Sequence, residues 1–245
     1  MTRKQYFSSG LKDGMPICFG YFAVSFAFGI QAAGIGLSVF EASVLSALNV
    51  TSAGQFAALA IIASGASLIE LAFTQLIINL RYFLMSCALS QKLSPSLPLG
   101  HRLGIAYGMT DEIFAVNVSQ REPLSPFYSY GLIAVAIPGW VLGTALGAAA
   151  GNILPAVLTN ALGIAIYGMF IAIILPPAKE NRVVAGVVVL SMVLSALFTY
   201  LPVLCNISSG FRIIIITLIT AGGAALLFPI PDEPAEPEKE MPHEG

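Results

Sequence analysis

The sequence predicts an all-α integral membrane protein with six full transmembrane helices and two broken or re-entrant segments, or alternatively eight spans. Hydrophobic residues make up 57% of the 245 residues and charged residues only 10%, against roughly 25% charged residues in a soluble domain. No Asp, Glu, Lys or Arg lies between Pro123 and Ala178. Apolar stretches of about 18 residues or more are typical of transmembrane helices, and stretches such as 183–201 lack the apolar–polar alternation of barrel strands.

Eight apolar segments follow one another with short connections and no soluble domain between them. They cover residues 16–37, 43–64, 67–90, 103–119, 130–150, 157–176, 183–204 and 212–230. Together they predict a single transmembrane domain over residues 1–230. The remaining residues, 231–245, hold six of the 13 acidic residues and four prolines. Since such a composition cannot bury enough apolar surface to fold, we expect a disordered acidic tail there.

Basic residues predict which connections face the cytoplasm, because Lys and Arg concentrate on that side of short loops. Arg3 and Lys4 precede the first segment, and Lys179 and Arg182 lie between the sixth and seventh. Both termini are therefore expected to be cytoplasmic. The loop 91–102, which carries two basic residues, faces outward if all eight segments cross. It faces inward if the second and fourth segments are re-entrant, so the number of full crossings stays open.

The second segment is polar where the middle of the bilayer should be. It reads Asn49-Val-Thr-Ser-Ala-Gly-Gln55. Irregular backbone at membrane depth survives only where it is buried or lines a watery cavity, and in transporters such breaks often form the binding site. The alternative is a continuous helix whose small polar residues pack against neighbouring helices. On the first interpretation, the candidate substrate-binding residues here are Thr51, Ser52, Gly54 and Gln55.

The third and fourth segments carry charged residues at membrane depth. Inserting one charged side chain at the centre of a transmembrane helix costs a free energy of about 2.5–3.5 kcal/mol. Arg81, with Asn79 close by, is a candidate for binding a carboxylate, because a guanidinium offers a planar fork of donors. Its alternative role is to reach the headgroups or to pair within the fold. Asp111 and Glu112 are candidates for binding an ammonium group or a coupling proton. Alternatively they only begin a half-helix after Thr110, and the sequence does not tell which acid is functional.

The fifth segment is expected to serve packing. Its glycines recur at every fourth residue and make a small-residue face that lets two helices approach closely. They are Gly139, Gly143, Gly147 and Gly151. The sequence offers no metal site and no cofactor motif, because its two histidines and three cysteines are scattered. No basic patch suggests a nucleic-acid partner.

Four elements, in order, carry a resemblance to a known family. They are Gly10–Gly29 with its Pro-Ile and Gly-Tyr pairs, Ser52–Phe56 in part, Asn79–Tyr82, and Thr110–Ala115. On these elements the first 120 residues resemble the AzlC family, the large subunit of AzlC/AzlD-type exporters of branched-chain amino acids. The second half resembles the family only in hydropathy and glycine content.

The resemblance implies a secondary transporter, and not an enzyme, in the bacterial inner (cytoplasmic) membrane. It implies export of leucine, valine, isoleucine and also methionine, together with a small AzlD-type membrane subunit as partner. Our hypothesis is proton-coupled export. A passive channel for small solutes is the alternative. A membrane-embedded hydrolase is disfavoured, because aspartyl catalysis needs two carboxylates that share a proton, and adjacent helical residues such as Asp111 and Glu112 point about 100° apart.

Overall fold

The computed structural model describes residues 2–120, 123–151, 153, 157, 171, 174–202 and 204–229, and this part of the chain is almost entirely helical. The predicted segment 157–176 and the tail 231–245 lie mostly or wholly outside it. The first seven helices are α1 (Arg3–Gly34), α2 (Val39–Leu48), α3 (Ser52–Ala63), α4 (Leu68–Lys92), α5 (Leu99–Tyr107), α6 (Asp111–Val118) and α7 (Pro126–Gly151). They are followed by α9 (Arg182–Tyr200), α10 (Ser209–Thr217), the π-helical turn η1 (Leu218–Gly222) and α11 (Gly223–Leu227).

Within the described residues, five helical stretches are long and apolar enough to cross a membrane. They are α1, α4, α7, α9 and the continuous run Gly210–Leu227. The fold class expected from the sequence is therefore confirmed. The exact number of crossings, and which side is the cytoplasm, stay predictions.

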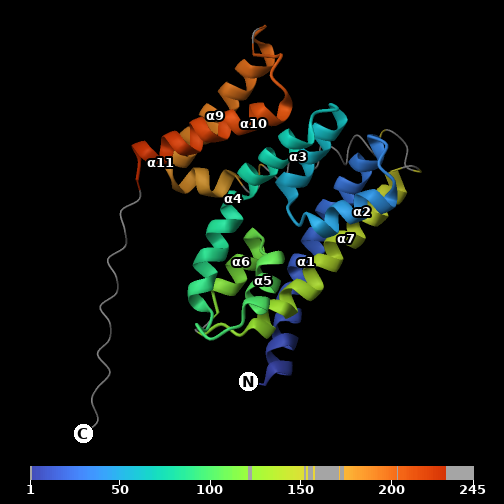
Figure 1. The fold of residues 1–245 in the computed structure, drawn as a ribbon, viewed down its shortest axis with the longest axis vertical. Coiled ribbons are helices and arrows are strands. Elements are labelled where there is room, and N and C mark those ends of the chain that lie inside the picture. The colour runs from blue at the N-terminus through green and yellow to red at the C-terminus, as the bar shows by residue number, and fades with distance from the viewer. Residues whose placement is uncertain are drawn as a thin grey trace.

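Helices α1 and α7 lie side by side and form the centre of the fold (Figure 1). Glycines on both helices allow this close contact. A methyl group added at Gly147 would come within 2.0 Å of the carbonyl oxygen of Phe26, and one at Gly143 within 2.1 Å of Ser25 Oγ. Gly139 and Gly151 also face α1. The glycine run of α7 thus lies against α1 along most of its length.

The second predicted segment is broken, as expected, and the two halves form a hairpin. Helix α2 ends at Leu48, and α3 begins only after Asn49–Thr51. Ala42 near the start of α2 and Leu59 near the end of α3 belong to one buried cluster at the C-terminal ends of α1 and α7. Both arms of the hairpin meet the same ends of α1 and α7, which is the arrangement expected of a re-entrant segment.

The fourth predicted segment is also broken and forms a second hairpin, which lies at the opposite end of the fold. Gly108–Thr110 separate α5 from α6. At the start of α5, His101 Nδ1 lies 2.8 Å from Tyr130 Oη near the start of α7. At the end of α6, Lys92 Nζ donates to the carbonyl of Val118 at 2.6 Å. The loop 91–102 therefore lies at the same end as the start of α1, which favours the six-crossing arrangement over eight spans.

The first six helices thus form two similar units of opposite direction. Each unit consists of one long helix followed by two half-helices, first α1–α2–α3 and then α4–α5–α6. Figure 1 shows α2 beside the upper part of the α1–α7 pair, and α5 and α6 beside its lower part. Because the two hairpins enter from opposite ends, the N-terminal ends of α3 and α6 meet near the middle of the fold. Transporters with inverted repeats bind their substrates at such a position.

The last described helices form an antiparallel pair at the edge of the fold (Figure 1). Glu70 near the start of α4 connects this pair to the rest. Its carboxylate accepts hydrogen bonds from Ser208 Oγ at 2.5 Å and from the backbone N–H of Gly210 at 2.8 Å. A carboxylate at the start of α10 stabilises the positive end of that helix, so Glu70 has a structural role here.

Candidate binding site

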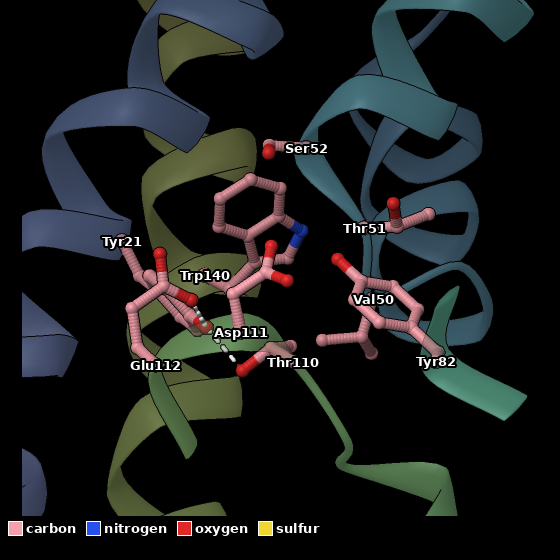
Figure 2. Close-up of a pocket in the computed structure, with 9 residues that line it drawn as sticks. All are labelled: Tyr21, Val50, Thr51, Ser52, Tyr82, Thr110, Asp111, Glu112 and Trp140. Carbon is pink, nitrogen blue, oxygen red and sulfur yellow. Dashed lines mark hydrogen bonds between the residues drawn. The ribbon is translucent and has the colours of Figure 1, made fainter. Parts of the chain in front are cut away.

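A pocket lies between the N-terminal ends of α3 and α6, beside the middle of α1, α4 and α7 (Figure 2). The space inside it is small, about 20 Å³. The residues that line it come from five helices and from the two breaks. They are Tyr21, Val50, Thr51, Ser52, Tyr82, Thr110, Asp111, Glu112 and Trp140.

The α3 side of the pocket presents the positive end of a helix. Thr51 caps α3, because its Oγ1 accepts a hydrogen bond from the backbone N–H of Gly54 at 3.3 Å. The first bond of the helical ladder runs from Gln55 N to Thr51 O. The N–H groups of Ser52 and Ala53 precede that bond, and such groups have no partner within a helix. The first turn of α3 contains no acidic residue, so the partial positive charge of about half a unit is not balanced within the helix.

The α6 side differs, because its first turn carries Asp111 and Glu112. Thr110 caps this helix in the same way as Thr51 caps α3, accepting from the N–H of Ile113 at 3.3 Å. Tyr21 Oη of α1 lies 2.6 Å from Glu112 Oε2 and 2.5 Å from Thr110 Oγ1. A phenol has only one proton to donate. When Glu112 is ionised, Tyr21 therefore donates to it and accepts from Thr110.

Arg81 pairs with Asp111 and does not line the pocket. Its Nη1 lies 2.8 Å from Asp111 Oδ2, with 41% and 39% of the two side chains exposed. A second nitrogen, Nη2, donates to Tyr82 Oη at 3.2 Å, and the guanidinium stacks 4.8 Å from the centre of the Tyr82 ring. The predicted carboxylate-binding fork is thus occupied by a carboxylate of the protein itself.

Three other predicted binding residues, Gly54, Gln55 and Asn79, hold the half-helices in place and do not line the pocket. Gln75 Nε2 donates to the carbonyl of Gly54 at 2.7 Å, and Asn79 Nδ2 donates to Gln75 Oε1 at 3.2 Å. Gln55 points the other way, where its Nε2 donates to Ser46 Oγ of α2 at 2.9 Å. Of the predicted site residues, only Thr51, Ser52 and the two acids of α6 reach the pocket.

The sequence of this region matches a known protein family. Residues 16–154 match the model of the family described as AzlC protein. The chain belongs to the AzlC family. The matched region contains both re-entrant hairpins, most of α1 and all of α4 and α7. All residues that line the pocket lie within it, and it extends beyond the first 120 residues on which the resemblance rested.

Two relatives of this AzlC chain cover most of its length. An "Uncharacterized membrane protein" from Archaeoglobus fulgidus is 35% identical over 189 residues, which cover 76% of this chain and 83% of the relative. "Inner membrane protein YgaZ" from Escherichia coli is 31% identical over 184 residues, or 72% of this chain and 75% of that protein. No solved structure matches this chain.

Sequence reasoning missed five pocket residues of this AzlC chain. Three of them are the aromatic residues Tyr21, Tyr82 and Trp140, and the other two are Val50 and Thr110. Tyr21 and Tyr82 lie inside two of the elements that carry the resemblance, and Trp140 is the sole tryptophan of the sequence. The rings of Tyr21 and Trp140 make an edge contact, with centres 5.3 Å apart. The one signal in the sequence for Trp140 was a single tryptophan within a glycine-rich segment. Its side chain faces the half-helices only because of the way α7 packs on α1.

Proposed function

We propose that this protein is a secondary active exporter of neutral branched-chain amino acids, driven by the proton gradient. The observation that carries the proposal is the pocket at the meeting point of two half-helices, with two carboxylates at one of them. Half-helix ends that point at a site near the middle of the membrane bind polar groups of substrates in transporters. The membership of the AzlC family supports a transport function.

The two acids have different partners, and this suggests different roles. Asp111 is paired with the cation of Arg81. Glu112 accepts a hydrogen bond from the neutral Tyr21, and no salt bridge to it is found within the described part of the chain. Glu112 is therefore the better candidate for binding the substrate's ammonium group or a coupling proton, while Asp111 holds Arg81 in place. The different partners also disfavour aspartyl hydrolysis, which needs two carboxylates that face one another and share a proton.

The apolar side chain of the substrate would meet the rings of Tyr21 and Trp140 and the side chain of Val50. These groups line the pocket together with the polar ends of α3 and α6. Leucine, valine, isoleucine and methionine have side chains that suit such contacts. We include all four in the proposed substrate class.

The proposal includes a small AzlD-type membrane subunit as partner and the bacterial inner membrane as location. The ion pair between Arg81 and Asp111 supports a partner, because about two fifths of each side chain is exposed. A charged pair at membrane depth is unfavourable where it meets lipid, and a second membrane subunit over its exposed part would keep lipid away from it.

Counterflow in proteoliposomes that contain both subunits tests the exporter. Vesicles loaded with unlabelled leucine should take up labelled leucine, with saturation and with a dependence on an imposed pH gradient. Glu112→Gln should abolish the pH dependence, because the amide cannot carry a proton. Absence of leucine exchange by the wild-type pair would reject the proposal, as would unchanged exchange in both Asp111→Asn and Glu112→Gln.

A passive channel for small solutes remains the second candidate, because two half-helices that enter from opposite sides also suit a pore. The same vesicles separate the two functions. A channel gives uptake that does not saturate with leucine, shows no counterflow and does not respond to the pH gradient.

A further inference from the structure

Trp140 carries a buried hydrogen-bond donor that the protein does not use. Its side chain is 3% exposed, and Nε1 has no hydrogen-bond partner among the described residues. An indole N–H can only donate. Because buried polar groups are nearly always hydrogen-bonded in native proteins, an unpaired one inside a pocket needs an explanation.

The indole nitrogen is turned toward the side of the pocket where α3 begins. Figure 2 shows Nε1 of Trp140 on the side of the ring that faces Thr51 and the hydroxyl of Tyr82, with Ser52 above the ring. The N–H groups of Ser52 and Ala53, which as first-turn groups have no partner within their own helix, belong to the same end of α3. Two independent kinds of donor, a side chain and a helix end, therefore point into one part of the pocket.

We propose that Trp140 Nε1 and the N-terminal end of α3 together bind the carboxylate of the substrate. A carboxylate offers only acceptors, and N–H groups at a helix start favour negative charge. The first turn of α3 supplies no acid of its own, in contrast to the first turn of α6. This inference rests on the proposed function, and it assigns the carboxylate to α3 and Trp140 in place of Arg81.

The charges around the pocket agree with this assignment. Arg81 neutralises Asp111, so the nearby carboxylate of the protein does not repel the carboxylate of a ligand. Glu112 on the other side offers a carboxylate to an ammonium group. The site therefore selects for a molecule with both a free carboxylate and a free amine, and it discriminates against amines and acids that have only one of them.

Trp140 also reports on the proposal directly, because it is the sole tryptophan of the chain. Leucine added to the purified full-length protein should change the tryptophan emission in a saturable way. The probes for comparison are 3-methylbutylamine, which is leucine without its carboxylate, and 4-methylpentanoate, which lacks the amine. Each should bind roughly tenfold or more weakly than leucine, since each loses a hydrogen-bonded charged group. Equal binding of leucine and the amine would overturn the proposal.

Trp140→Phe removes the donor and keeps an aromatic ring. In counterflow we expect the half-saturation concentration of leucine to rise roughly tenfold or more. The concentration of 3-methylbutylamine that inhibits leucine exchange should stay the same. A merely structural effect would weaken leucine and the amine alike. That outcome, or wild-type affinity for leucine in Trp140→Phe, would contradict the proposal.

A backbone variant tests the contribution of the α3 end. Ser52→Pro deletes the backbone N–H at the first helical position, where proline is well tolerated. Thr51 before it has φ −153° and ψ 122°, which suits a residue that precedes proline. Its reference is Ser52→Ala, which alters the same side chain but keeps the N–H. We expect Ser52→Pro to bind leucine several-fold more weakly than Ser52→Ala, and equal affinities would remove the α3 end from the proposal.

The two readouts distinguish failure of this inference from failure of the exporter. A saturable emission change with leucine and not with 3-methylbutylamine supports the carboxylate site even if the vesicles show no exchange. Exchange of leucine by the wild-type protein, with no change of emission and no effect of Trp140→Phe, rejects the carboxylate site and leaves the exporter standing.

Discussion

At the scale of single residues, two charged groups at the site form an ion pair that the sequence does not reveal. Arg81 and Asp111 are 30 positions apart and come from α4 and α6. The sequence indicated that each needs a reason to be in the membrane, and it offered pairing within the fold as one alternative for Arg81. It could not name the partner, because only the packing of α6 against α4 brings the two side chains together.

Removing one member of this pair should destabilise the protein more than removing both. Arg81→Leu leaves Asp111 without its cation, at a penalty of up to about 3 kcal/mol on insertion scales. The double variant Arg81→Leu/Asp111→Leu removes both charges and should recover much of that loss. Melting temperatures in detergent measure the comparison. A double variant that is as unstable as the sum of the two single ones would show that the pair is not coupled.

At the scale of helices, local signals predicted the two breaks but not their directions. Polar residues from Asn49 to Gln55 and the Thr-Asp-Glu sequence at Thr110–Glu112 mark the helix starts, because threonine is a good cap and acids favour a first turn. Gln55 was expected to bind substrate but is used to join α3 to α2. On a short helix, neighbouring residues face different elements, and only the tertiary structure tells which face meets the pocket.

The contact between α1 and α7 gives a prediction at this scale. Gly147→Ala would bring a methyl group to 2.0 Å from the carbonyl oxygen of Phe26, and overpacking of this kind costs about 1–3 kcal/mol. Gly186→Ala in α9 is the matched control, because a methyl group there has no neighbour within 4 Å among the described atoms. We expect a lower melting temperature for Gly147→Ala only. Equal melting temperatures of the two variants would mean that α1 and α7 do not approach as closely as described.

At the scale of the whole molecule, the sequence left the number of full crossings as a pair of alternatives, six or eight. Hydropathy does not distinguish a re-entrant hairpin from a full crossing, since both are apolar and of similar length. The basic residues of the loop 91–102 favoured the re-entrant version, and the contacts of His101 and Lys92 agree with it. Which end of the fold faces the cytoplasm can be determined only by an experiment on the protein in a membrane.

Cysteine labelling measures that sidedness. In a background without Cys18, Cys87 and Cys205, a cysteine at Ser94 should react with an impermeant reagent from the same side as one at Ser125. A cysteine at Ser64, which follows α3 at the other end of the fold, should react from the opposite side. Reaction of the Ser94 and Ser125 positions from different sides would contradict the re-entrant arrangement of α5 and α6.

The opposed hairpins also bear on how a solute would pass through the proposed exporter. The α2–α3 hairpin is anchored at one end of the fold and the α5–α6 hairpin at the other, and both end at the same pocket. In the proposed exporter, moving one hairpin would open the pocket to one side while the other hairpin still closes the opposite side. The two units of opposite direction would then supply, from a single repeated pattern, both exits that alternating access requires.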